Sequence, residues 1–151
     1  MELVDRIPRE YNLTRIILPF TVDEELPGNY AAGHYGKYSY TLDEDAIIVA
    51  AIAGCNIDYT NTAVQECHVI GVLSHRPIEK LVEESRYAWC KVGASHRQPA
   101  QVVDLRGAIG SYILMRREET LHVYASAWAK NTSSVPVYWK TFVGAIVRVK
   151  G

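Results

Sequence analysis

The sequence predicts an all-β fold, a single-domain sandwich or small barrel of short antiparallel strands. Short segments rich in apolar and β-branched residues recur at spacings of roughly 8 to 15 residues, with turn residues between them. At most one segment has the periodicity of a helix. In addition, two pairs of segments resemble each other: residues 46–54 and 68–73 form one pair, and residues 121–129 and 142–147 form the other.

The paired segments indicate which strands form the core. In each pair a segment of small residues precedes a second segment with a glycine at its centre, Gly71 or Gly144. Glycine weakens a strand, so it usually marks a bulge, a corner or the close approach of another backbone. We expect all four segments in the core and both glycines at corners. The pattern is either a duplication of half the domain or a chance recurrence in a chain rich in valine and alanine.

The first half of the chain predicts an arm followed by strands. Residues 1–11 are charged and contain Pro8, which is typical of an extended N-terminal arm, and residues 12–151 form the single β-rich domain. A strand is expected over residues 13–22, and Pro19, which cannot donate a ladder hydrogen bond, either places it at a sheet edge or breaks it. The segments that follow are a turn at 26–30, a short strand at 35–40, an acidic turn at 41–45, a strand at 47–52, a loop at 56–62 and a strand at 64–73.

The second half contains the one segment with helical periodicity. Over residues 78–87, Ile78, Leu81 and Val82 fall at positions i, i+3 and i+4 behind Pro77. A short helix or a loop leading into the next strand fits this segment. The remaining strands are expected at 87–92, 102–105, 112–115, 121–128 and 135–149, with turns at 106–108, 116–119 and 130–134.

Composition excludes several classes of protein. A chain of 151 residues with a formal net charge of −1 lacks the basic surplus of a nucleic-acid-binding domain. Its N-terminus does not read as a signal peptide, and no apolar run approaches the ~20 residues of a membrane helix. The three cysteines, Cys55, Cys67 and Cys90, are odd in number and lack Cys-x-x-Cys spacing, so we expect neither a disulfide framework nor a zinc ribbon.

Two tripeptides repeat the same polar chemistry. Ser74-His75-Arg76 and Ser95-His96-Arg97 each follow an expected strand. A serine next to a histidine in sequence does not readily form a catalytic dyad, because such partners normally meet through the fold. The two tripeptides are therefore solvated loops, or binding loops for an anionic or sugar ligand at one end of a sandwich.

Other candidate sites favour structural roles, so no enzyme, cofactor or metal site is expected. Cys67, His68 and His75 could supply metal ligands, but strand alternation sends Cys67 and His68 to opposite faces. Acidic residues at 43–45 and 118–119 stand in turns, where carboxylates are usually solvated rather than tuned for acid–base chemistry.

The aromatic residues suggest contacts with a partner. Ten tyrosines and three tryptophans stand against two phenylalanines, a balance typical of interfaces and ligand sites. High β propensity of tyrosine is the alternative reason for it. The tyrosines predicted to contact a partner are Tyr11, Tyr30, Tyr35, Tyr38 and Tyr40.

Four segments together resemble a known class of protein. Residues 87–93 are aromatic, residues 107–114 run from glycine to leucine, residues 121–127 contain alanines, and residues 142–147 read Val-Gly followed by small aliphatics. Across residues 65–149 this order resembles β-rich virion proteins of tailed bacteriophages, such as capsid decoration (cement) proteins. Ser111 stands where an acidic residue often follows the glycine, and Arg116 and its neighbours replace an expected glycine.

The resemblance implies a non-enzymatic structural protein that forms a homotrimer, decorates a capsid and bridges subunits of the coat lattice. Its location would be the virion, assembled in the host cytoplasm, with the N-terminal arm supplying part of the contact. The alternative is a carbohydrate-binding or other ligand-binding β module. In that alternative Trp89, Trp128 or Trp139 would stack on sugar rings and the Ser-His-Arg loops would supply hydrogen bonds.

Overall fold

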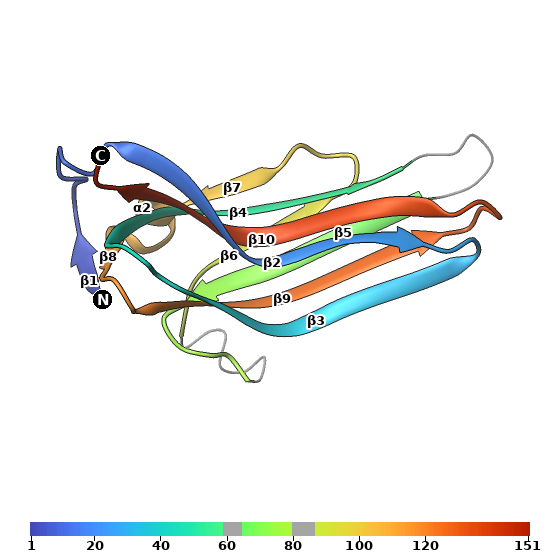
Figure 1. Ribbon diagram of the computed structural model, residues 1–151, viewed down its shortest axis with the longest axis horizontal. Coiled ribbons are helices and arrows are strands. Elements are labelled where there is room, and N and C mark those ends of the chain that lie inside the picture. Colours follow the sequence, from blue (N-terminus) through green and yellow to red (C-terminus); the bar gives the residue numbers. More distant parts are fainter. Residues whose placement is uncertain (59–64, 80–86) are drawn as a thin grey trace.

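Two antiparallel sheets pack face to face in the computed structural model of the chain (Figure 1). The structure describes residues 1–58, 65–79 and 87–151. The predicted sandwich is confirmed, and the sheets do not close into a barrel. Several strands are 12 to 14 residues long, longer than expected, because they continue through the segments read from sequence as turns and loops.

One sheet has six strands and the other has four. The six-stranded sheet runs in the order β1-β8-β4-β10-β2, with β7 also beside β4, and the four-stranded sheet runs β3-β9-β5-β6. Pro19 lies in β2, which is an edge strand as predicted. The strands are β1 (Glu2–Val4), β2 (Leu13–Leu26), β3 (Tyr30–Thr41), β4 (Ala46–Ile57), β5 (Gln65–Ser74), β6 (Ala88–Ser95), β7 (Gln101–Asp104), β8 (Tyr112–Met115), β9 (Thr120–Asn131) and β10 (Val137–Val149).

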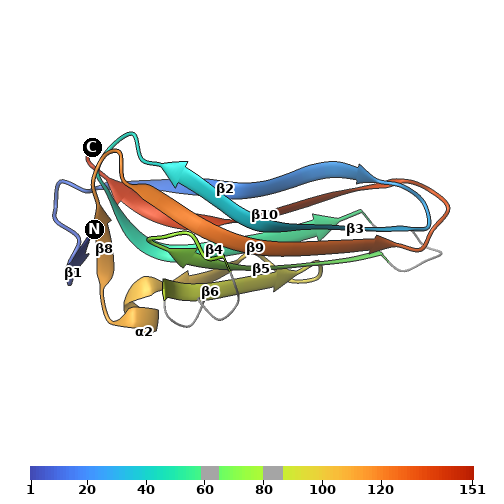
Figure 2. The same ribbon diagram turned by 90° about the horizontal axis from the view of Figure 1, so that it is seen from below.

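The path of the chain is that of a jelly roll. From β2 to β5 each successive strand changes sheet, β5 and β6 pair within one sheet, and β8, β9 and β10 again alternate between the sheets. Without the short β1 and β7, the sheets have four strands each, in the orders β8-β4-β10-β2 and β3-β9-β5-β6, which is the paired Greek-key arrangement of a jelly roll. The strands run along the length of the molecule, and both chain termini lie near the same end (Figures 1 and 2).

The two similar pairs of segments found in the sequence form the central strands of the two sheets. β4 and β10 are neighbours in one sheet, and β9 and β5 are neighbours in the other. The prediction that both glycines stand at corners is wrong. Gly71 lies inside β5, where a Cβ would overlap the side chain of Val143 from the opposite sheet, and Gly144 lies at a bulge of β10, where a Cβ would overlap the carbonyl of Ile17.

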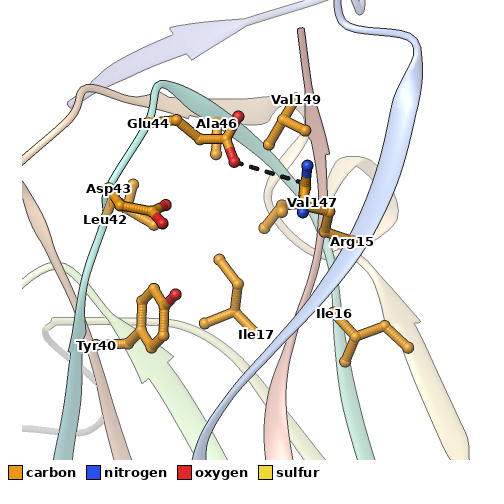
Figure 3. Close-up of a pocket in the computed structure, with 10 residues that line it drawn as sticks. All are labelled: Arg15, Ile16, Ile17, Tyr40, Leu42, Asp43, Glu44, Ala46, Val147 and Val149. Atoms are coloured by element: carbon orange, nitrogen blue, oxygen red, sulfur yellow. Dashed lines mark ion pairs between the residues drawn. The ribbon is translucent and has the colours of Figure 1, made fainter. Parts of the chain in front are cut away.

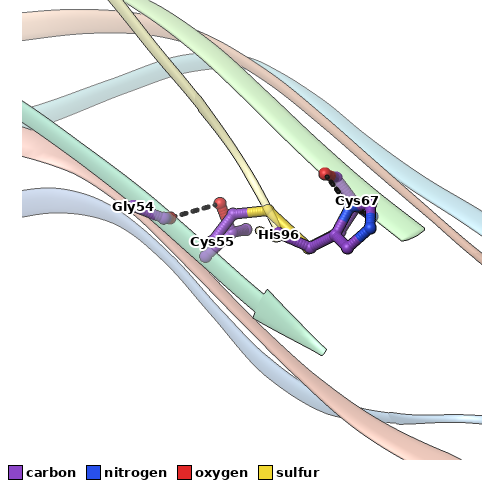
Figure 4. Close-up of a disulfide and its surroundings, with 5 residues drawn as sticks. Gly54, Cys55, Cys67 and His96 are labelled. Atoms are coloured by element: carbon purple, nitrogen blue, oxygen red, sulfur yellow. Dashed lines mark hydrogen bonds between the residues drawn. A yellow bond between two sulfur atoms is a disulfide. The ribbon is translucent and has the colours of Figure 1, made fainter. Parts of the chain in front are cut away.

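A disulfide joins the two sheets, which corrects the expectation drawn from the odd number of cysteines. Cys55 of β4 and Cys67 of β5 are bonded across the sandwich, with their Cα atoms 6.5 Å apart (Figure 4). The backbone N–H of Cys67 donates to Nδ1 of His96 at 3.2 Å. The third cysteine, Cys90, is free, and burial raises the pKa of its thiol to about 11.

The N-terminal arm folds back onto its own domain. β1 pairs with β8 at the edge of the six-stranded sheet. Tyr11 is only 4% exposed and packs with Ile47 and Leu114 in a small apolar cluster. The ammonium group of Lys150 lies 5.4 Å from the centre of the Tyr11 ring. The arm therefore covers one end of this sheet's outer face.

Helical structure occurs where the sequence predicted a turn. Residues expected as a turn at 106–108 belong to a short helix, α2 (Leu105–Ile109). The carboxylate of Asp104 accepts a hydrogen bond from the N–H of Gly107, and Gly110 ends the helix in a left-handed conformation. Most of the helix expected over 78–87 lies outside the described residues.

The disulfide predicts a specific change in stability. Replacing Cys55 and Cys67 together by serine should lower the free energy of unfolding by about 3 kcal/mol, because the bond closes a short loop that would otherwise be free in the unfolded chain. Chemical denaturation of the wild type and the double variant measures the difference.

The reductant supplies the control. Dithiothreitol should lower the melting temperature of the wild type and leave that of the double variant unchanged. Denatured, unreduced wild-type protein should take up one alkyl group, on Cys90. Three alkyl groups would show that the bond is absent.

Candidate interaction surfaces

The five tyrosines predicted as contacts divide between the surface and the interior. Successive residues of β3 point to opposite sides of the sheet. Tyr35 lies on the outer side and is 77% exposed, whereas Tyr30 and Tyr40 have the same parity as Tyr38 but lie near the ends of the strand, where they are exposed. Tyr38 points into the sandwich, with its ring 4.7 Å from that of Phe20. Tyr11 and Tyr38 thus pack within their own chain, which leaves three tyrosines for a partner.

The Ser-His-Arg tripeptides lie at opposite ends of a strand pair. β5 and β6 are antiparallel, and each tripeptide begins at the C-terminal end of its strand. The idea that both loops grip one ligand at one end of the sandwich is therefore wrong. His75 stacks against Trp89 at 5.9 Å, whereas His96 bonds to the backbone beside the disulfide.

The residues considered for metal binding do not come together. Cys67 is in the disulfide, while the side chain of His68 lies on the outer face of its sheet against Trp128. His75 packs on Trp89. Within the described ranges, no group of three or more histidine, cysteine or acidic side chains is arranged to hold a metal ion.

The acidic turns carry structural hydrogen bonds. Asp45 accepts from the backbone N–H of Arg117 at 2.8 Å, and this bond holds the pKa of the Asp45 carboxyl below its usual value. Glu119 accepts from the N-terminal ammonium at 2.7 Å and from the N–H of Arg116 at 2.8 Å. These bonds lower the pKa of the Glu119 carboxyl.

The three tryptophans have different environments. Trp139 is completely buried, and its Nε1 donates to Glu24 at 3.2 Å. Trp89 is half-buried under His75. Trp128 is 37% exposed on the outer face of the four-stranded sheet. Of the tryptophans considered for stacking on a ligand, Trp128 is the best placed.

A pocket of about 340 Å³ opens between β2, β10 and the segment joining β3 to β4 (Figure 3). Ile17, Leu42 and Val147 give it apolar walls. Arg15 and Glu44, 3.5 Å apart, form an ion pair across it. Its polar lining consists of Arg15, Tyr40, Asp43 and Glu44.

The outer face of the six-stranded sheet carries a continuous apolar area, which we call the apolar face. One row of residues crosses this face. Ile52 of β4 lies between Val102 of β7 and Gly144 of β10. The side chain of Leu18, from β2, lies over Gly144. This row crosses four strands. Phe142 and Ile146 lie on the same side of β10 as Gly144, two residues before it and two residues after it. The apolar face consists of Ile16, Leu18, Ile52, Val102, Phe142 and Ile146.

The two sides of the apolar face are open to solvent, whereas its centre is covered. Ile16 is 57% exposed, Val102 is 54% exposed and Leu18 is 37% exposed, but Ile52 between them is only 9% exposed. Sequence reasoning missed this surface. The signal for it is the run Ile16-Ile17-Leu18, which is apolar on both sides of an edge strand although the core needs only one side.

The contacts of Glu119 predict a pH-dependent stability. Because its pKa is lower in the folded state, its stabilising effect is complete above the usual glutamate value of 4.5 and is lost as the pH falls through the folded-state pKa. Glu119→Gln should therefore cost about 0.5 kcal/mol near pH 7 and nothing in strong acid. Melting temperatures of both proteins across the acid range test this, and a constant difference would contradict it.

No family model matches the chain, and no curated protein matches it. Among the described residues, no helix is long and apolar enough to cross a membrane. The surfaces themselves are therefore the basis for a functional proposal.

Proposed function

We propose that this protein is a non-enzymatic structural protein whose copies associate through the apolar face, and that it serves as a virion capsid decoration protein bridging coat subunits. The observation that carries the proposal is the apolar row across β7, β4, β10 and β2. Ile16, Leu18 and Val102 are exposed on this side, and exposed apolar residues gathered on one face often mark an interface.

A second copy of the chain is the occupant that fits the apolar face best. Burial of apolar surface contributes roughly 25 cal/mol per Å², and the exposed Ile16, Leu18 and Val102 supply such surface. The rim carries both signs of charge, with Asp23 and Lys140 paired at 3.7 Å near one end and Arg148 and Asp104 near the other. Opposite charges on one rim suit a surface that meets its own copy.

The net charge also permits association. At a formal net charge of −1, copies of the chain repel each other weakly. The resemblance to phage decoration proteins favours three copies, so that the homotrimer is the expected assembly. Closure of an oligomer would in addition shield sheet edges from unwanted pairing.

Two further features support a place on a virion. Jelly rolls are an architecture of viral capsid domains, although a fold alone does not fix a function. A disulfide such as Cys55–Cys67 is typical of proteins exposed to oxidising surroundings, virion surfaces among them. Tyr30 and Tyr40, exposed near the two ends of the edge strand β3, are the proposed contacts with the coat lattice.

The proposal predicts that charge on the apolar face separates the copies. Wild-type protein should elute as an oligomer, a trimer having three times the 17.0 kDa of one chain. Leu18→Asp and Val102→Asp should each weaken association about 30-fold or more, because each places a carboxylate in a buried interface. Size-exclusion chromatography with light scattering measures the mass over a concentration series.

Val135→Asp is the matched control, since Val135 is equally exposed but lies between β9 and β10, away from the apolar face. It should leave the mass unchanged. A wild-type protein that stays monomeric at high concentration would overturn the proposal. So would an oligomer that both face variants leave intact.

A further inference from the structure

The outer face of the four-stranded sheet presents Trp128 in an unusual setting. In the strand register Trp128 lies directly between Gly33 of β3 and His68 of β5. Its ring is nearly parallel to that of His68, with 5.5 Å between the ring centres and 19° between the planes. On the other side Gly33 has no side chain, and a Cβ built there would meet only the carbonyl oxygen of Ala127, at 3.6 Å. One side of the indole is thus packed, and the other borders open space.

The next row of the sheet extends this surface. This row crosses all four strands and consists of Tyr35 (β3), Ser126 (β9), Ile70 (β5) and Gly93 (β6). Tyr35 is 77% exposed and Ile70 is 50% exposed, and between them stands the short side chain of Ser126. We call the two rows the aromatic platform: Gly33, Trp128, His68, Tyr35, Ser126 and Ile70.

The aromatic platform has a boundary along the strands. One row further on, Val72 is only 2% exposed although it points outward, and Ile78 of the following segment is buried as well. The end of that segment reaches β3, where Glu79 pairs with Lys37 at 2.7 Å. Of the described residues, those that follow β5 cover the sheet beyond the platform, while Tyr35, Ile70 and Trp128 within it are exposed.

The charges beside the platform are balanced. Lys130 of β9 lies opposite Glu66 of β5, on the side of the platform away from Val72. Lys37, on the other side, has Glu79 as its partner. Charges of both signs favour neither a polyanion nor a polycation, and the hydrogen-bonding groups of the platform are the Ser126 hydroxyl, the Tyr35 hydroxyl and the His68 imidazole.

We propose that the aromatic platform binds the neutral pyranose units of a glycan chain. The C–H bonds on one face of a pyranose ring are weakly positive and suit the negative face of an indole. Trp128 would stack on one ring over Gly33, and Tyr35, on the diagonal position of the next strand, would contact the neighbouring unit. Ser126, between Tyr35 and Ile70, would bond to sugar hydroxyls. This site lies on the opposite side of the sandwich from the apolar face.

Affinity electrophoresis tests the glycan site. Native gels would contain soluble dextran, mannan, galactomannan, xyloglucan or hydroxyethyl cellulose. At least one of these polysaccharides should retard the wild-type protein. Trp128→Ala should weaken that binding at least 10-fold, and Tyr35→Ala should weaken it less. Tyr138→Ala, which removes a comparably exposed tyrosine from the other sheet, should have no effect.

A second variant guards against a fold defect in Trp128→Ala. Gly33→Leu keeps the tryptophan but fills the open space beside it, where the backbone leaves room for a Cβ. It too should weaken the binding at least 10-fold. The inference is overturned if no polysaccharide of the panel retards the wild type, or if both variants bind as the wild type does. It is also overturned if Trp128→Ala dissociates the oligomer, since the platform would then be a contact between copies.

Discussion

The close approach of the two sheets is the constraint on which the rest of the structure depends. Side chains at the centre of the interface are small, and Gly71 has none, so that Val143 from the opposite sheet fits over it. Alanines line both inner faces: Ala51, Ala53 and Ala145 from one sheet, and Ala125, Ala127 and Ala129 from the other. The disulfide between Cys55 and Cys67 fixes the same spacing covalently. Larger residues at these positions would force the sheets apart, at a cost of roughly 1–3 kcal/mol for each overpacked site.

This packing decides which residues face outward. Residues of a strand alternate between the two sides of a sheet. Since alanine and valine of β9 and β10 point inward, the residues between them point outward. The middle of one outer face carries apolar residues, with Leu18 and Val102 at the ends of a row. The middle of the other carries Trp128 stacked on His68, with Tyr35, Ser126 and Ile70 in the next row. The two sides therefore have different chemistry, and we assign them different partners.

The sequence predicted the central strands and missed what depends on their register. Repeated small residues identified β4, β5, β9 and β10, because only such strands let two sheets approach closely. The pairing of Cys55 with Cys67 depends on two strands of different sheets facing each other, which neither spacing nor cysteine number reveals. Tyr38 was predicted to meet a partner but points inward, because it shares the parity of Ala32, another residue packed against the core. The neighbours of Trp128 come from strands distant in sequence, so the platform appears only once the register is known.

We propose that copies of the chain meet through the apolar face and leave the aromatic platform free. Hydroxyl-radical footprinting with mass spectrometry tests it directly, at concentrations below and above that at which the protein associates. We predict that oxidation of Leu18, Val102 and Phe142 falls on association, while oxidation of Trp128 and Tyr35 stays constant. Protection of Trp128 and Tyr35 with an unchanged apolar face would contradict the account.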